Sequence, residues 1–153
     1  MLLAIDPGNV ESAYVVVDKN LKPIEFGKIP NEDMLPTINS ACFHGRIKEV
    51  AIEMVACYGM PVGKEVFDTC VWIGRFVQEA EGYANVNYVY RKDEKIHICG
   101  NMRAKDSNIR QALIDRFGVV GTKKDKGWFY GFKGDIWSSY AVAVTYKEMR
   151  KAV

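Results

Sequence analysis

The chain has 153 residues, of which 48% are hydrophobic and 26% are charged, and its formal net charge at pH 7 is +2. This composition excludes disordered, collagenous and low-complexity proteins, and the length is that of one domain able to bury about 68–70% of the surface its unfolded chain exposes. No apolar run approaches the ~18–20 residues that span a bilayer, and a carboxylate at position 6 is not typical of a secretory leader. We therefore expect one cytoplasmic domain over residues 1–153.

The four cysteines are separated by 15, 13 and 29 residues, and the chain has two histidines. These spacings are not those of a zinc site, and a disulfide framework is not expected without a secretory leader. The predicted core therefore depends on apolar burial.

Short runs rich in β-branched and aromatic residues, separated by turns, make up the beginning of the chain. Pro7-Gly8 ends the first run, and Asn20 and Pro23 bracket the next turn, so an antiparallel three-stranded meander is predicted. A later strand carries one charge, Glu53, inside an apolar run, and the helix after it has helical apolar spacing. The elements expected up to residue 90 are strands over 2–6, 13–18 and 24–29, a helix over 31–43 capped by Asn31, a strand over 50–55, a helix over 63–81 and a strand over 86–90.

The rest of the chain begins with a basic segment, from Arg91 to Lys105, that shows no clear period. The order of elements predicts an α/β protein with a mixed sheet and helices packed on its faces. The elements expected after the basic segment are a helix capped by Asp106 or Ser107 that ends at Gly118, a loop rich in glycine, lysine and aromatic residues over 121–133, and a final helix over 135–150.

Charge is unevenly divided along the chain. Residues 1–90 hold 7 Lys and Arg against 12 Asp and Glu, whereas residues 91–153 hold 14 against 7. A basic second part is typical of a protein that meets a polyanion, although solvated charge also falls unevenly by chance. Both interpretations stay open at this point.

Three acids that are far apart in the sequence occupy strand or helix ends. Asp6 and Glu53 each lie in or after an apolar strand, and adjacent strands of one sheet would bring both to the same edge. Burying two carboxylates together is costly unless a cation lies between them, and hard oxygen ligands suit Mg²⁺ or Mn²⁺. Asp135, at the start of the last helix, is a candidate third ligand. The structural alternatives are a turn residue, an outward-facing strand residue and a helix cap, respectively.

The segments around these acids resemble the motifs of RuvC-type Holliday-junction resolvases, which belong to the ribonuclease H-like (retroviral integrase) superfamily. The matching segments are Ala4–Asn9, Ala51–Glu53 and Asp135–Ala143. The resemblance implies a ribonuclease H-like mixed sheet, with a three-stranded antiparallel meander plus parallel strands and helices on both faces. It also implies that Asp6, Glu53 and Asp135 hold two Mg²⁺ ions, with Mn²⁺ as an alternative, for in-line hydrolysis of a phosphodiester.

Two positions depart from that family pattern. Ser138 stands where the resolvases carry a further aspartate, and it is a candidate metal contact through a bound water. Ala56 stands where many of them carry an aromatic residue that stacks on DNA bases. Either Tyr58 or Met60 takes that role here, or the segment is only a turn between a strand and a helix. By the same resemblance Lys105 lies near the scissile phosphate and stabilises charge in the transition state, with a solvated lysine as the alternative.

Basic residues of the second part are predicted to contact the DNA backbone. The lysines of the loop over 121–133 alternate with Trp128, Phe129, Tyr130 and Phe132. This pattern is suited to phosphate contact by the lysines and base stacking by the aromatic rings. The alternative is that the aromatic residues belong to the core or to a dimer contact. The residues assigned to DNA binding are Arg91, Lys92, Arg103, Lys105, Lys123, Lys124, Lys126 and Tyr58.

We expect a magnesium-dependent, structure-specific endodeoxyribonuclease that resolves four-way junctions by paired nicks. The resemblance to RuvC-type resolvases implies a phage-type or bacterial member of that family. Paired nicks in a symmetric junction favour a homodimer, with the helix over 66–77 and its Trp72, Gly74 and Phe76 as the candidate contact and core packing as the alternative. Three rival hypotheses stay open: a nuclease that cuts RNA–DNA hybrids or flaps, a junction-binding protein with weakened catalysis, and a nucleotide-binding phosphotransfer protein. The last lacks a P-loop glycine cradle.

Overall fold

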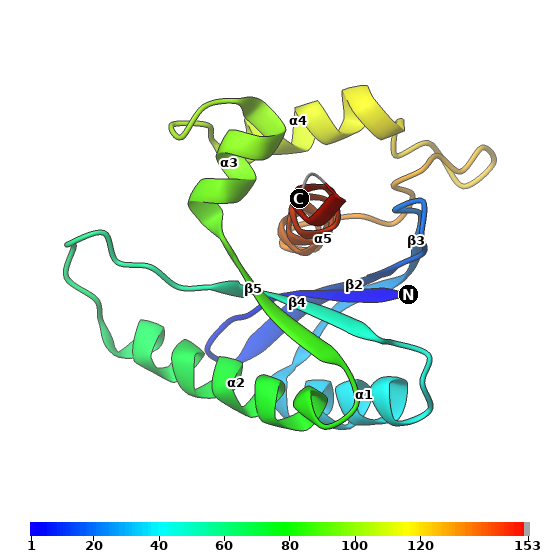
Figure 1. The fold of residues 1–153 in the computed structure, drawn as a ribbon. Helices are drawn as coiled ribbons and strands as arrows, with labels where there is room; N and C mark the ends of the chain where they lie inside the picture. The colour runs from blue at the N-terminus through cyan, green and yellow to red at the C-terminus, as the bar shows by residue number, and fades with distance from the viewer. Residues whose placement is uncertain (152–153) are drawn as a thin grey trace.

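Five strands form one sheet with its first strand at the centre (Figure 1). β1 (Leu2–Asp6), β2 (Glu11–Val17) and β3 (Pro23–Pro30) form an antiparallel meander, and β4 (Glu49–Met54) and β5 (Asn85–Tyr90) extend it in the order β3-β2-β1-β4-β5. β4 runs parallel to β1, and β5 runs parallel to β4. The computed structural model describes residues 1–151, and its mixed sheet confirms the predicted fold class.

Helices cover both faces of the sheet (Figure 1). α1 (Asn31–Phe43) and α2 (Lys64–Glu81) lie on one face, and α3 (Arg91–Cys99), α4 (Asp106–Phe117) and α5 (Ile136–Lys151) lie on the other. α5 packs directly on β1 and β2, and α3 and α4 pack against α5. In residues 1–151, no helix is both long and apolar enough to cross a membrane.

Alternating side chains of β1 contribute to two separate cores. Leu2 and Ala4 pack in the core that contains α5, whereas Leu3 and Ile5 pack in the core that contains α1 and α2. All four are at most 1% exposed. The same alternation places Asp6, the next even-numbered residue, on the face that carries α5.

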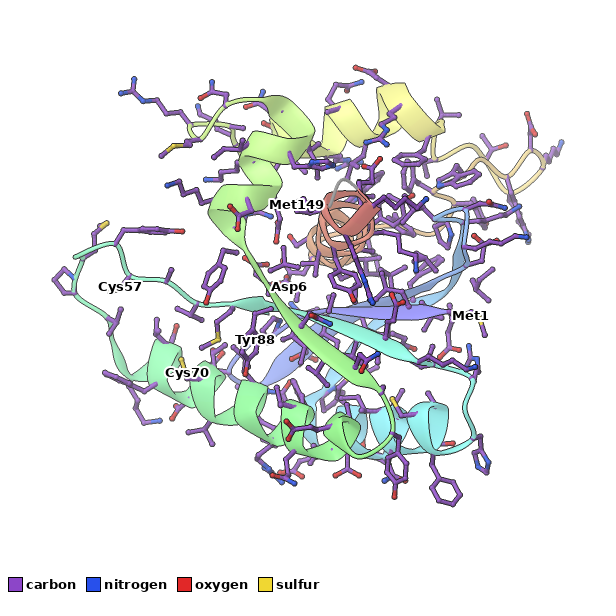
Figure 2. The ribbon with its side chains drawn as sticks, viewed as in Figure 1. Met1, Asp6, Cys57, Cys70, Tyr88 and Met149 are labelled. Atoms are coloured by element: carbon purple, nitrogen blue, oxygen red, sulfur yellow. The ribbon has the colours of Figure 1, made fainter. Side chains whose placement is uncertain are left out.

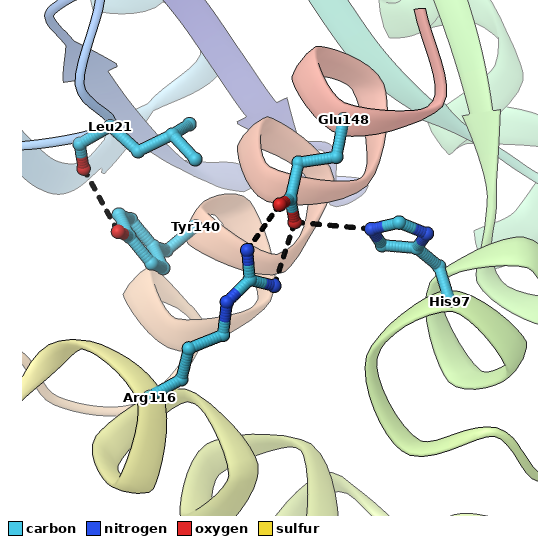
Figure 3. A network of polar contacts seen from close by, with 5 residues as sticks. All are labelled: Leu21, His97, Arg116, Tyr140 and Glu148. Atoms are coloured by element: carbon cyan, nitrogen blue, oxygen red, sulfur yellow. Dashed lines mark hydrogen bonds and ion pairs between the residues drawn. The ribbon is translucent and has the colours of Figure 1, made fainter. Parts of the chain in front are cut away.

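A polar network ties the helices of that face together (Figure 3). Arg116 Nη1 of α4 donates to Glu148 Oε1 of α5 at 2.7 Å, and His97 Nε2 of α3 lies 3.1 Å from the same oxygen. The hydrogen bond from Arg116 lowers the pKa of Glu148, so the carboxylate is ionised at neutral pH. The Tyr140 hydroxyl of α5 donates to the Leu21 carbonyl at 2.8 Å, which fixes the helix to the turn between β2 and β3.

Two predicted helix caps are wrong. Asn31 is the first residue of α1, and Pro30 precedes it in the cap position. Lys105, and neither Asp106 nor Ser107, precedes α4. The Asn31 side chain forms its hydrogen bonds with Ser12 and Gly8. Asp106 and Ser107 lie after the cap position of α4.

α3 is an element that the sequence analysis did not predict. Its fully buried side chain is an acid, Glu94, so an apolar period is missing from the sequence. Ile98 and Cys99 pack partly against the core, and Gly100 ends the helix at a positive φ of 68°. The helix therefore forms through packing on α5 and not through a clear hydrophobic pattern.

Candidate active site

Asp6 and Glu53 lie side by side at neighbouring strands. Ile5 of β1 pairs with Ile52 of β4 in parallel register, so the next step along both strands brings the two acids opposite each other. Both face the α5 side because alternate residues of each strand contribute to that core. Asp6 therefore lies between the sheet and the helical layer (Figure 2).

Burial raises the pKa of both carboxyl groups. The pKa of Asp6 is raised to about 9, first by burial and then by the charge of Glu53 and a hydrogen bond with it. Burial also raises the pKa of Glu53, although the nearby Arg91 opposes that shift. The two carboxyl groups therefore share a proton near neutral pH unless a cation takes its place.

The turn that follows Asp6 is held by side-chain hydrogen bonds. The Gly8 N–H donates to Ser12 Oγ at 3.1 Å, the Ser12 hydroxyl donates to Asn31 Oδ1 at 2.6 Å, and Asn31 Nδ2 donates to the Gly8 carbonyl at 2.9 Å. A Cβ at Gly8 would lie 2.3 Å from the Glu11 carbonyl oxygen, so glycine is required at this close approach. The end of β1 is thereby held in one position.

Asp135 reaches the same place from the residue before α5. It lines a pocket of about 290 Å³ together with Asp6. Its Oδ2 accepts a hydrogen bond from Lys28 Nζ of β3 at 2.7 Å, and both side chains are about half exposed. Asp135 thus shares a pocket with Asp6, which lies opposite Glu53 on the neighbouring strand, and its ion pair adds a lysine that the sequence analysis did not select.

A second pocket, of about 360 Å³, adjoins Asp135 on the side of α4. Ser138 lines it from the first turn of α5, on the same side of the helix as Asp135. The basic side chains that line it are Arg91 and Arg110. Lys105 is exposed just before α4, next to a residue of this pocket.

Glu94 is an acid near the site that the sequence analysis missed. Its side chain is fully buried, and its Oε2 accepts from Arg91 Nη1 at 2.7 Å. The same guanidinium pairs with Asp106, so it joins α3 to the start of α4. Burial and then the charge of Glu53 raise the pKa of Glu94 to about 8. Two adjacent acids within a basic segment do not show which of them is buried, so sequence spacing offered no signal for Glu94.

The donor chemistry of the site suits a hard divalent cation. Asp6, Glu53 and Glu94 are carboxylates close enough to repel one another, and Glu94 Oε1 is buried without a hydrogen-bond partner. Among residues 1–151, no three Asp, Glu, His or Cys side chains are grouped as a ready-made ligand shell. Mg²⁺ usually takes one or two protein carboxylates and completes its shell with water and phosphate oxygens. Asp6 and Glu53 are the residues that would hold such an ion.

Comparison with known proteins identifies the architecture. No protein-family model and no curated protein matches the chain. A solved structure described as T. thermophilus RuvC in complex with Holliday junction substrate is similar over 99% of this chain and 95% of that chain, with a TM-score of 0.73 and 14% sequence identity. The chain has the RuvC fold. A second Thermus thermophilus RuvC structure matches over 99% of this chain and 96% of that chain, with a TM-score of 0.67 and 14% identity.

On this RuvC fold, most residues assigned to DNA contact lie in two exposed groups. One group surrounds α3 and the segment before α4, and the other lies on a hairpin closed by the bridge between Gly121 and Lys126. Arg91 differs because its guanidinium is paired with two carboxylates, and Tyr58 is 65% exposed on the loop after β4. The exposed members are Lys92, Arg103 and Lys105 in the first group and Lys123, Lys124 and Lys126 in the second.

The aromatic residues next to that hairpin belong mainly to the core of the RuvC fold. Phe129 is fully buried and Phe132 is 6% exposed, and Trp128 Nε1 donates to the Tyr140 hydroxyl at 3.2 Å. Tyr130 is half-buried, with the Lys126 ammonium 5.2 Å from its ring centroid. The core interpretation therefore holds for Phe129 and Phe132, while the lysines are solvated.

Proposed function

We propose that this protein is a divalent-cation-dependent endonuclease that resolves four-way DNA junctions, with the chain acting as one nuclease domain. The observation that supports the proposal is the position of Asp6 on a RuvC-fold sheet, opposite Glu53 on the neighbouring strand and in one pocket with Asp135. A fold alone hosts many functions, so the chemistry of these side chains is the stronger support.

The site residues provide what hydrolysis of a phosphodiester requires. A bound Mg²⁺ or Mn²⁺ would supply a Lewis acid and an activated water. Asp6 and Glu53 would hold the ion at the floor of the site, and Asp135 contributes a further carboxylate from the start of α5. Arg110 lines the adjacent pocket, and Lys105 precedes Asp106, which also lines it; both would neutralise charge that develops on the phosphate.

A four-way junction is the substrate that we propose. The RuvC structure with the TM-score of 0.73 is described as a complex with Holliday junction substrate. The exposed basic residues that we assign to DNA contact lie in two groups, around α3 and on the hairpin that contains Lys123, Lys124 and Lys126. Separate basic surfaces suit a DNA with several arms, and contacts to the backbone recognise its shape and not its sequence.

A cleavage assay tests this function. Purified protein is incubated with a labelled synthetic four-way junction, a linear duplex of the same sequence and an RNA–DNA hybrid, each with Mg²⁺, Mn²⁺ or a chelator. We expect paired nicks in the junction that need the metal ion. Dominant cleavage of the hybrid would reassign the substrate, and junction binding without cleavage under any metal would favour the catalytically weakened alternative.

The hairpin lysines should account for part of the salt dependence of junction binding. Replacing Lys123, Lys124 and Lys126 with alanine removes three solvated charges, so the slope of log K against log salt should become smaller by about 2–3. Binding is measured by fluorescence anisotropy between about 50 and 200 mM salt. A charge-matched control replaces exposed lysines elsewhere in the chain, Lys19, Lys48 and Lys64, and should leave the slope unchanged. Equal slopes for the two triple variants would contradict the assignment.

Two matched nicks require two active sites, and we propose a homodimer to supply them. Phe76 cannot be a dimer contact as predicted, because its side chain is fully buried in the core and Trp72 packs against the same core. The exposed apolar side chains of α2 are instead Phe67 and Val71, which are 61% and 63% exposed and one turn apart. This pair is the better candidate for the contact.

The double variant Phe67→Glu with Val71→Glu should therefore be monomeric. We expect a lower sedimentation coefficient and an accumulation of singly nicked junction of at least about tenfold, since two carboxylates in a small apolar interface are costly to desolvate. Glu65→Lys changes the charge of the same helix by the same magnitude but with the opposite sign, on a different side, and serves as the control. A double variant that sediments like the wild type would exclude this surface.

A further inference from the structure

The buried carboxylate of Glu94 has an oxygen without a partner. Glu94 lies in the first turn of α3, its side chain is 0% exposed, and its Oε2 accepts from Arg91 Nη1 at 2.7 Å. Oε1 is buried and has no hydrogen-bond partner among the described residues. A buried charged oxygen that lacks a partner is costly, so its retention needs an explanation.

The surroundings of this oxygen carry excess negative charge. Glu94 interacts electrostatically with both Glu53 and Asp6, which are themselves largely buried. The positive group in contact with Glu94 is the Arg91 guanidinium, and this group also pairs with Asp106. Glu94 and Glu53 thus face one guanidinium that is already divided between two partners, and Asp6 adds a third carboxylate, which is an environment that attracts a cation.

We propose that Glu94 is part of the cation site, where it supplies the third buried carboxylate beside Asp6 and Glu53. Its Oε1 is the oxygen available to the ion or to a water that the ion carries. The inference rests on the proposed function only in its assumption that a divalent cation binds between β1 and β4. It adds a residue on α3 to a site otherwise built from strand ends and the start of α5.

A purely structural role for Glu94 would have a different consequence. If the carboxylate served only to anchor Arg91, glutamine would keep a hydrogen-bond acceptor for that guanidinium at nearly the same place. A role in cation binding depends on the negative charge, which glutamine lacks. Glu94→Gln therefore separates the two roles.

The test is a Mn²⁺ titration of the full-length protein without DNA, followed by electron paramagnetic resonance of the free ion. We expect Glu94→Gln to weaken Mn²⁺ binding about tenfold or more, because loss of a group that only orients a ligand already costs about that much. Its melting temperature without metal should not fall, since one source of buried repulsion is removed. Asp93→Asn is the control and should bind Mn²⁺ as the wild type does, because Asp93 lines a pocket at β5 and the end of α5 instead.

Unchanged Mn²⁺ affinity in Glu94→Gln would overturn the inference, and so would a wild type that binds no Mn²⁺. If Glu94→Gln does not fold, Glu94→Asp replaces it. This variant keeps the charge, but its shorter side chain moves the carboxylate oxygens toward the helix backbone. A wild-type affinity for Mn²⁺ in Glu94→Asp would also overturn the inference. Junction cleavage in the same samples keeps the two proposals apart. A wild type that binds Mn²⁺ but cuts no junction contradicts the proposed function alone, whereas cleavage with equal Mn²⁺ affinity in the variant contradicts the role of Glu94 alone.

Discussion

Replacing Asp6 with asparagine should reduce junction cleavage by about 10³-fold or more, because loss of one preorganised electrostatic group at a reacting centre alone costs about 10²–10³-fold. The substitution keeps the shape of the side chain, but it removes the charge that faces Glu53 and lines the pocket shared with Asp135. Single-turnover cleavage of a labelled four-way junction with saturating Mg²⁺ measures the effect.

The control for this loss is Asp33→Asn, an exposed acid in the first turn of α1 on the opposite face of the sheet. It should cleave at the wild-type rate. Junction binding by Asp6→Asn should remain, since the basic groups around α3 and on the hairpin are untouched. Cleavage by Asp6→Asn at the wild-type rate would remove the basis of the proposed cation site.

The same carboxyl group makes the stability of the metal-free protein depend on pH. The pKa of Asp6 is about 9 in the folded protein against 3.8 for an ordinary aspartate, first because of burial and then because of Glu53. Between these values the folded state binds more protons than the unfolded state, so the free energy of unfolding falls as pH rises through that window. Asp6→Asn should flatten this decline and stabilise the metal-free protein at pH 8 by about 1–2 kcal/mol, as measured by urea unfolding. A wild-type stability that rises from pH 5 to pH 9 in a chelator would contradict the assignment.

Phe129→Ala should have the largest effect on stability. Phe129 is fully buried, and the centroid of its ring lies 4.7 Å from that of Trp137 and 5.0 Å from that of Tyr140. Truncation of a buried phenylalanine costs about 3–5 kcal/mol, a large part of the about 5–15 kcal/mol by which domains are stable. At about 2–4 °C per kcal/mol for a chain of this length, the melting temperature should fall by at least about 6 °C.

This variant also distinguishes a core residue from a base-stacking one. Lys124→Ala, on the neighbouring hairpin, is exposed and should change the free energy of unfolding by no more than about 0.5 kcal/mol. A Phe129→Ala protein that melts like the wild type but loses junction affinity would mean that the ring contacts DNA and that its burial is not maintained in solution.

The hydrophobic pattern predicted an element correctly where the buried side chains of that element are apolar. The runs around Asp6 and Glu53 leave each carboxylate near the end of an apolar strand, and strand register then brings both to one edge. The pattern failed over α3, since its buried position carries Glu94 and not an apolar residue. It also failed to separate the two uses of an aromatic side chain, because Phe129 and an exposed stacking residue look alike in sequence.

The meander, most of the helices that follow it and the acids of β1 and β4 could be predicted from residue patterns, because burial along a single element leaves a periodic trace. Tertiary structure alone decided that Lys28 reaches Asp135, that Arg91 is shared by Glu94 and Asp106, and that α2 exposes Phe67 while it buries Phe76. Such contacts join residues on different elements, and their energies depend on how those elements pack against one another. Spacing along one chain does not record that packing, which is why the ion pairs around the site became visible only in three dimensions.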